Sequence, residues 1–267
     1  MSELLDTAVA AAKSGGEVLL ANWRNLPHGS VEEKRKNDFV TQADRDSEER
    51  IIATIRARFP KDAFLAEEGG ARAGAAHGAR EWIIDPLDGT SNFVSGFPFW
   101  CVSIAAREGD TLTAAVVWDP LRNELYTAER GAGAHRNGTR LSVTPRTGLD
   151  GAFIATGFPF RNREKIDTYL ALFRAIFVEA RAIRRAGSAA LDLAYVASGV
   201  FDGFFEFRLS PWDVAAGALL IEEAGGVLTD FDGGSDYLER GNVIAGPPGV
   251  VEGIRRAARG IVTEGSI

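Results

Sequence analysis

The stretch Trp82–Phe93 constrains the fold of this chain more than any other part of the sequence. It begins with the apolar run Trp82-Ile83-Ile84, which predicts a buried strand that ends at Asp85-Pro86. Asp88 follows within a proline-containing turn, and Gly89-Thr90-Ser91-Asn92 predicts a helix start with free backbone N–H groups. The sequence therefore predicts two carboxylates that face N–H donors at the end of one strand.

Two neighbouring carboxylates need compensation for their charge. At about 4 Å they repel each other by roughly 4 kcal/mol at an effective dielectric constant of about 20. Either one acid is protonated or a cation lies between them, and a divalent metal would also give the N–H groups a metal-coordinated phosphate as their partner. A simple turn explains an isolated Asp-Pro or Asp-Gly pair. It does not explain a second acid followed by Thr90-Ser91-Asn92.

A family resemblance is carried by the run Asp85-Pro86-Leu87-Asp88-Gly89-Thr90-Ser91-Asn92-Phe93. This run resembles the signature of the inositol monophosphatases, which are magnesium-dependent, lithium-sensitive phosphatases, and Ser91 stands where the family has Thr. A second segment, Trp212-Asp213 followed by Ala215-Ala216-Gly217 and Glu223-Ala224-Gly225-Gly226, resembles the second family signature. The resemblance extends from about Lys36 to Gly246. It implies a sugar phosphatase fold, an α+β, layered α-β-α-β-α sandwich with mixed, antiparallel-rich sheets.

Length and composition are those of an ordinary soluble globular protein, with 267 residues, 45% of them hydrophobic and 25% charged. We interpret residues 1–267 as a single inositol monophosphatase-like domain with an internal seam near 145–152. The net charge of −7 disfavours unspecific nucleic-acid binding as the main activity. The sequence has one cysteine, no secretion signal at Met1–Asp6 and no apolar stretch of about 18 residues, so we expect a cytoplasmic protein without a membrane span.

Hydrophobic periodicity predicts both helices and strands along the chain. Two segments are predicted to be surface: the charge run Lys34–Asp38 and an exposed flexible loop over Gly69–Arg80. The predicted elements are a helix over Ser2–Trp23, a helix from Thr41 to the stop at Pro60, an antiparallel meander over Phe97–Val143, a strand over Ala152–Gly157, a helix over about Arg163–Arg181, a strand over Phe201–Phe207, and closing strands before a helix near Val250–Arg259.

Three further acids join the candidate metal site through the resemblance. Thr41 and Asp44 form a capping box, and the family also has an Asp at the matching position near a third, weakly held metal. Glu67 follows the predicted strand end at Phe64-Leu65-Ala66, and it matches the first Glu of the family's Gly-Glu-Glu element. Asp213 lies at a predicted helix start after Ser210-Pro211, where capping alone would explain it, and in the family this Asp completes the metal site.

Oxygen donors without Cys or His at ligand spacing suit Mg²⁺ or Mn²⁺ better than Zn²⁺. We predict two or three Mg²⁺ per subunit, with Mn²⁺ as a substitute, held by Glu67, Asp85, the Leu87 carbonyl, Asp88, Asp213 and, for the third ion, Asp44. Glu67, Thr90 and Asp88 are the predicted catalytic residues, with Glu67 and Thr90 orienting a metal-activated water for direct attack on phosphorus. A Cys–His mechanism is disfavoured because Cys101 would need a base as its partner, and His28, His77 and His135 all lie in turn-like sequence.

The resemblance also assigns the substrate contacts. In the family, the segment matching Gly187-Ser188-Ala189 approaches the hydroxyl ring of the substrate, and the residue matching Glu206 binds a substrate hydroxyl. The predicted contacts are Asp88, Gly89, Thr90, Ser91, Gly187, Ser188, Ala189, Glu206 and Asp213. They favour inositol 1-phosphate or a similar small polyol phosphate. The same metal chemistry also serves fructose 1,6-bisphosphate, histidinol phosphate and phosphoadenosine phosphate, which remain alternatives.

The resemblance implies a homodimer, and it also suggests a second role beside catalysis. Some bacterial relatives are linked to transcription and RNA processing. The basic clusters Arg181-Arg184-Arg185 and Arg255-Arg256-Arg259 would suit binding to RNA or to RNA polymerase. Because the candidate metal ligands are intact, we expect such a role to be added to catalysis and not to replace it.

Overall fold

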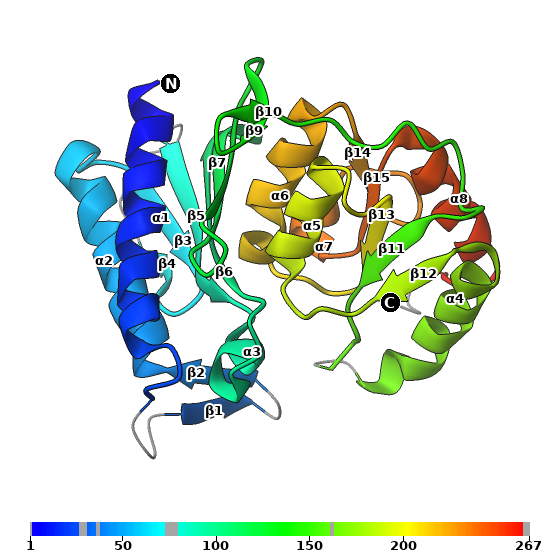
Figure 1. Cartoon of the computed structure of the whole chain (residues 1–267), viewed down its shortest axis with the longest axis horizontal. Coiled ribbons are helices and arrows are strands. Elements are labelled where there is room, and N and C mark those ends of the chain that lie inside the picture. Colours follow the sequence, from blue (N-terminus) through cyan, green and yellow to red (C-terminus); the bar gives the residue numbers. More distant parts are fainter. Residues whose placement is uncertain (1, 27–30, 36–37, 73–79, 161–162, 264–267) are drawn as a thin grey trace.

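The computed structural model describes residues 2–26, 31–35, 38–72, 80–160 and 163–263, and these form five layers (Figure 1). Helices α1 (Glu3–Asn22) and α2 (Gln42–Arg58) cover the outer face of a first sheet. Helices α5 (Ala189–Ala197) and α6 (Pro211–Glu223) lie between the first sheet and a second one. Helices α4 (Ile166–Glu179) and α8 (Pro248–Ala258) cover the far side of the second sheet. The predicted layered α+β fold with mixed sheets is confirmed.

The first sheet has the strand order β10-β9-β8-β7-β6-β5-β3-β4. Strand β3 is parallel to β5, and the other neighbours are antiparallel, so the predicted meander is present as β6 to β10. The strands are β3 (Ala63–Ala66), β4 (Gly70–Arg72), β5 (Arg80–Asp88), β6 (Cys101–Glu108), β7 (Thr111–Asp119), β8 (Glu124–Glu129), β9 (Gly133–Arg136) and β10 (Thr139–Arg140).

The second sheet has the order β12-β11-β13-β15-β14 and is mixed. Strand β11 is parallel to both β12 and β13, whereas β15 is antiparallel to β13 and β14. Its strands are β11 (Phe153–Thr156), β12 (Ala182–Arg184), β13 (Gly203–Glu206), β14 (Val227–Thr229) and β15 (Val243–Gly246). The chain passes from the first sheet to the second between Arg140 and Phe153, a stretch that contains the predicted seam. The number of domains stays a prediction.

Three hydrophobic clusters hold the five layers together. One lies between α1, α2 and the first sheet, a second joins the first sheet to α5 and α6, and a third fills the space beneath α4 and α8. Helix α1 packs closely because of its small residues. A Cβ atom at Gly15 would lie 2.7 Å from Ile51, and one at Gly16 would lie 2.7 Å from the Trp118 ring. The two glycines therefore set the distance between the outer layer and the sheet.

Strand β5 is longer than predicted. We expected it to end at Asp85-Pro86, but it continues to Asp88 and remains paired with β6. The register shifts between Asp85 and Asp88, so Pro86, which has no N–H group to donate, lies within the irregular segment. Pairing with β6 thus overrides the local turn signal, and both acids are carried on the strand itself.

Three other local predictions were wrong or incomplete. Residues Gly70–Arg72 of the predicted loop form β4, while 73–79, with His77, lie outside the described residues. The charge run Lys34–Asp38 overlaps a hairpin of β1 (Val31–Arg35) and β2 (Asp38–Thr41), whose charged sequence gave no strand pattern. His135 belongs to β9 and not to a turn. His28 also lies outside the described residues.

Short helices complete the description: α3 (Thr90–Ser95), the 3₁₀ turn η1 (Arg163–Lys165) and α7 (Tyr237–Arg240). Within the part of the chain that the structure describes, none of the helices combines the length and the apolar character that crossing a bilayer would require.

Candidate active site

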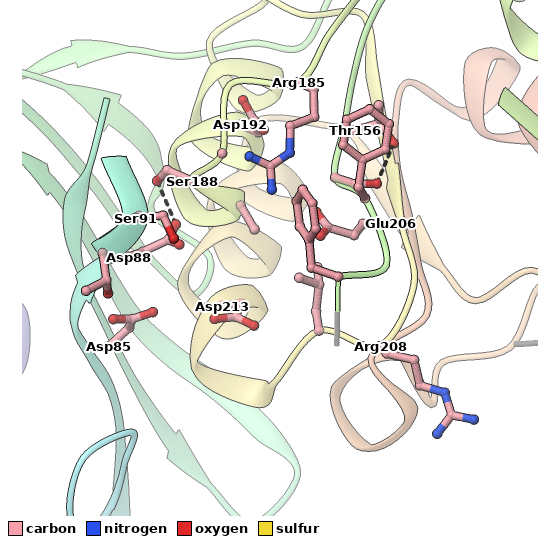
Figure 2. A pocket seen from close by; sticks show the side chains of 18 of the residues that line it. Asp85, Asp88, Ser91, Thr156, Arg185, Ser188, Asp192, Glu206, Arg208 and Asp213 are labelled. Carbon is pink, nitrogen blue, oxygen red and sulfur yellow. Dashed lines mark hydrogen bonds between the residues drawn. The ribbon is translucent and has the colours of Figure 1, made fainter. Parts of the chain in front are cut away.

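A pocket of about 390 Å³ lies where the two sheets and their central helices meet (Figure 2). One wall comes from β5 and α3, and the opposite wall comes from β11, α5, β13 and the start of α6. Every site residue predicted from the sequence lines this pocket except Asp44. The lining groups thus come from segments that are far apart in the chain.

An acidic cluster forms the floor of the pocket. Asp85 and Asp88 extend from β5, and Asp213 extends from the first turn of α6. One carboxylate oxygen from each of these three residues lies within 4.8 Å of the other two. Asp85 and Asp88 are buried, at 1% and 8% exposure. The fold therefore concentrates three acids where water is largely excluded.

Local hydrogen bonds fix the orientation of each acid. Asp88 Oδ2 accepts a hydrogen bond from the Ser188 hydroxyl at 2.6 Å and one from the Ala190 N–H at 2.7 Å. Asp85 Oδ1 accepts from the Leu87 N–H at 2.9 Å. Asp213 Oδ2 accepts from the Ser210 N–H at 2.7 Å within the predicted capping box of α6. The start of α5 thus positions an acid of β5 across the boundary between the two sheets.

Burial and the neighbouring negative charges raise the pKa of Asp85 and of Asp88. Burial is the main cause of the raised pKa of Asp88, about 7, and the negative charge of Asp213 adds to it. Burial also raises the pKa of Asp85 well above its usual value, with further contributions from Glu67, Asp88 and Asp213. Carboxylates held in this way favour either protons or a bound cation.

The donor set fits a hard divalent cation. The cluster consists of carboxylate oxygens only, and the groups of metal-binding type that converge here among the described residues are Asp85, Asp88 and Asp213. Mg²⁺ and Mn²⁺ prefer such ligands, whereas Zn²⁺ sites usually include His or Cys. The cluster is therefore suited to a metal of the predicted kind.

Glu67 and Thr90 lie close to β5, the strand that carries Asp85 and Asp88. Glu67 follows β3, lines the pocket, and donates its backbone N–H to the Ile84 carbonyl at 3.2 Å. The Thr90 hydroxyl lies 3.1 Å from the Leu87 carbonyl and 3.2 Å from Asp44 Oδ1. The Leu87 carbonyl, a predicted metal ligand, is thus a direct neighbour of a predicted catalytic hydroxyl.

Asp44 is linked to the pocket through Thr90. Asp44 Oδ2 accepts hydrogen bonds from the Thr41 N–H at 3.0 Å and the Thr41 hydroxyl at 2.6 Å, so the predicted capping box is present. Burial raises the pKa of Asp44 to about 6. Its role toward a third metal stays a prediction.

A sharp turn brings the backbone of α3 to the pocket. Gly89 caps this helix with a left-handed backbone (φ 96°), and Gly89, Thr90 and Ser91 all line the pocket. Asn92, to which we assigned no separate role, stabilises this turn through hydrogen bonds of its side chain. Its Nδ2 donates to the Phe99 carbonyl at 2.7 Å and to the Ala186 carbonyl at 2.9 Å. Asn92 therefore joins α3 to the segment that precedes α5.

The opposite wall contains the predicted substrate contacts. Gly187, Ser188 and Ala189 line the pocket at the start of α5, although the Ser188 hydroxyl already donates to Asp88. Glu206 lies at the end of β13, and its carboxylate occupies the space that a side chain at Gly157 would need. Gly157 thus makes room for Glu206 to lie against the pocket.

Sequence reasoning missed several residues of this wall. Thr156, Phe158, Phe160, Asp192 and Arg208 line the pocket without an earlier assignment, and Arg185 was noted only as part of a basic cluster. The sequence signal for Phe158 and Phe160 was a pair of aromatic residues directly after a predicted strand, and the structure shows both side chains to be partly exposed. Asp192 gave no signal because one acid in an otherwise apolar helix has no distinctive pattern.

The fold and the pocket define a layered α+β protein with a carboxylate cluster suited to divalent cations. The inositol monophosphatase family model matches residues 1–263, and the chain belongs to this family. It is 49% identical over 249 residues to the Nus factor SuhB of Pseudomonas aeruginosa, which covers 92% of each chain. The SuhB structure from Bartonella henselae is 41% identical with a TM-score of 0.93, covering 98% of this chain and 100% of that one. Inositol monophosphatase from Anabaena is 35% identical with a TM-score of 0.87, covering 99% and 98%. Family membership supports a phosphatase activity.

Metal binding should stabilise the protein more at pH 8 than at pH 6. An Asp side chain in the unfolded chain has a pKa of roughly 3.9, whereas Asp88 has a pKa of about 7 in the folded protein. Without metal, the folded state retains protons that the unfolded state has lost, so its free energy of unfolding falls as the pH rises from about 4 to about 7. Bound Mg²⁺ compensates the negative charge of the acids and so removes this loss of stability at the higher pH.

The measurement is the melting temperature with saturating MgCl₂ and with EDTA at both pH values. We expect the Mg²⁺-induced increase to be larger at pH 8 by a few degrees, on the order of 1–2 kcal/mol. An equal or smaller increase at pH 8 would contradict the assignment of these acids as the metal site.

Proposed function

We propose that this protein is a Mg²⁺-dependent phosphomonoesterase that hydrolyses inositol 1-phosphate or a similar small polyol phosphate. The observation that carries the proposal is the convergence of Asp85, Asp88 and Asp213 beside the backbone turn at Gly89. A phosphate ester brings negative charge to a pocket floor that is itself negative. Such a substrate can bind only when cations are held by the acids.

Glu67, Asp85, the Leu87 carbonyl, Asp88 and Asp213 are the proposed ligands of two metals, and Asp44 is the proposed ligand of a third. Bound Mg²⁺ would supply positive charge that polarises the phosphate and makes water a better nucleophile. The cluster brings together the oxygen donors that this role requires, and two of its three members are buried.

The other roles belong to groups of the protein itself. We assign Glu67 and Thr90 to orienting the attacking water for direct displacement at phosphorus. The N–H groups of Gly89 and Thr90 would hold the phosphate oxygens, with Ser91 beside them, because these residues line the pocket next to the acids. Asp88, Asp213, Glu206 and the start of α5 at Gly187–Ala189 would contact the alcohol part of the ester.

A panel of phosphate esters tests the proposal. Phosphate release should be measured with Mg²⁺ from inositol 1-phosphate, fructose 1,6-bisphosphate, histidinol phosphate and phosphoadenosine phosphate. We expect inositol 1-phosphate to give the highest kcat/KM, EDTA to abolish turnover, Mn²⁺ to restore part of it, and Li⁺ to inhibit. Relatives at 25% and 26% identity have been solved with bound inositol monophosphate and with bound 2′-AMP, so both ester classes belong in the panel. No release from any ester would overturn the proposal.

We also propose a homodimer, in the cytoplasm, with helix α4 at its interface. This helix exposes Ile166, Leu170 and Phe177 along one face at 38%, 49% and 59%, with Val178 beside them at 76%. Exposed large apolar side chains on one helix face are typical of an interaction surface.

Introducing charge on this face should therefore produce a monomer. The variant combining Leu170→Glu and Phe177→Glu should sediment at half the mass of the wild type in analytical ultracentrifugation. Its fold should be intact, because both side chains are exposed within one chain. A Glu239→Gln variant on α7 is a control that should not change the mass. A charged variant that keeps the wild-type mass would exclude α4 as the interface.

A second role in binding RNA or transcription machinery is favoured by the name Nus factor that several relatives carry, at 44–49% identity. Arg181 and Arg184 are the candidate contacts, since both are exposed and lie over the Phe153 ring at 5.4 and 4.8 Å. The second cluster is less suited because Arg255 and Arg259 pair with Glu252, and Arg256 with Glu179. Co-purification of RNA or RNA polymerase that survives Asp88→Asn would support this added role.

A further inference from the structure

Asp192 is a buried acid of the pocket that the proposed mechanism does not use. It lies in the first half of α5, lines the pocket, and is 1% exposed (Figure 2). Within the described residues, its Oδ1 atom has no hydrogen-bond partner. The acids on the pocket floor differ in this respect, since Asp88 and Asp85 each accept hydrogen bonds from neighbouring groups.

An unpaired buried carboxyl oxygen is costly for a fold to maintain. Leaving such a group without a partner destabilises a protein by roughly 1–3 kcal/mol, and more if the group is charged. The position of Asp192 on the pocket wall offers an explanation for this cost, because a molecule that enters the pocket can provide the missing partner. Unsatisfied polar groups of this kind are typical of sites that discriminate between ligands by hydrogen bonding.

The neighbours of Asp192 indicate the chemistry of that partner. The charge of Glu206 acts on Asp192, and so does the charge of Arg185, which is held over the Phe160 ring at 4.8 Å. Around Asp192 the wall thus has two carboxyl groups and one guanidinium group, while the side chain of Arg208, further along the same wall, points away from them (Figure 2). A second phosphate would meet two acids there and only one base, whereas a hydroxyl can donate to a carboxyl oxygen.

We propose that Asp192 is a substrate-binding residue that accepts a hydrogen bond from a hydroxyl of the alcohol part of the ester. Together with Glu206 it selects phosphate monoesters of polyols over esters without hydroxyls and over bisphosphates. This inference rests on the proposed phosphatase function and deepens it, since it names the group that recognises the alcohol part of the ester. Burial raises the pKa of Asp192 well above its usual value, as expected for a carboxyl group with an oxygen that has no hydrogen-bond partner among the described residues.

The test compares two esters that differ only in their hydroxyl groups, inositol 1-phosphate and cyclohexyl phosphate. Asp192→Ala should lower kcat/KM for inositol 1-phosphate at least tenfold, mainly by raising KM. The kcat/KM for cyclohexyl phosphate should change less than twofold. Asp192→Asn, which keeps the volume and a hydrogen-bonding oxygen, should recover much of the loss. Leu193→Val is the matched control: it alters packing in the same helix outside the pocket, and should leave the ratio between the two esters unchanged.

The outcomes separate this inference from the proposed function. Wild-type protein that hydrolyses neither ester would overturn the proposed function as a polyol phosphatase, and the role of Asp192 as a substrate contact would fall with it. Wild-type activity combined with an Asp192→Ala effect of equal size on both esters would overturn the inference alone, because it would indicate a structural role. No effect on either ester would also overturn it. A melting temperature for each variant identifies any loss of folding, in which case Asp192→Asn decides the question.

Discussion

Replacing Asp88 with asparagine should lower kcat by about a thousandfold, which corresponds to about 4 kcal/mol of transition-state stabilisation. Asn can still accept the hydrogen bonds from Ser188 and Ala190 through its one oxygen. Its amide group, however, places a neutral N–H₂ beside Asp213 where the wild type has a carboxylate. The variant should therefore fold normally but hold the metal poorly, and phosphate release from inositol 1-phosphate measures the loss.

Stability provides a second measure of the same change. Since burial and the charge of Asp213 raise the pKa of Asp88 to about 7, removing this acid should stabilise the metal-free protein at pH 8. The melting temperature in EDTA should rise, and the further increase caused by Mg²⁺ should shrink. Asp110→Asn, in the exposed turn between β6 and β7, is the control that should change neither value. Near-normal turnover by Asp88→Asn would remove Asp88 from the centre of the proposed mechanism.

The local part of the site could be predicted from the sequence because its residues are close together in the chain. Asp85, Asp88 and the Gly89 turn lie within a few residues, and a strand followed by a helix start brings them to one place. Asp213 was different. Its capping role is a local pattern, but only the family resemblance connected it with Asp85, and the structure is needed to bring the oxygens of the cluster within 4.8 Å.

The parts that escaped prediction depend on tertiary contacts. The extension of β5 past Pro86 follows from its pairing with β6, which no local pattern reports. Asp192 is a similar case, because its burial and its unpaired oxygen arise only when α5 packs against the second sheet beside Glu206. The layer order was predictable only through the resemblance, since hydrophobic periodicity gives the elements and not their partners.

Replacing Gly89 with alanine should lower kcat/KM by about a hundredfold, because small displacements of positioning groups have effects of this size. Gly89 has φ 96°, and a Cβ atom there would lie 3.0 Å from the Phe99 carbonyl oxygen and 3.3 Å from that of Gly187. The backbone must therefore shift, which moves the N–H groups of Gly89 and Thr90 and the adjacent Asp88. Inorganic phosphate should become a weaker competitive inhibitor to a similar degree, since the proposed phosphate contacts are the groups that move.

A matched control separates this displacement from simple backbone strain. Gly109 also has a left-handed backbone, with φ 60°, but a Cβ atom there would have no other group within 4 Å. Gly109→Ala should therefore lose about 1–2 kcal/mol of stability while keeping full activity. If Gly89→Ala shows the same modest loss of stability with unchanged inhibition by phosphate, the N–H groups at this turn do not bind the phosphate. Both variants have a strained backbone, but only Gly89→Ala is also crowded by neighbouring groups. A loss of activity in Gly89→Ala that Gly109→Ala does not show, at a similar loss of stability, would therefore support the N–H groups of this turn as the phosphate contacts.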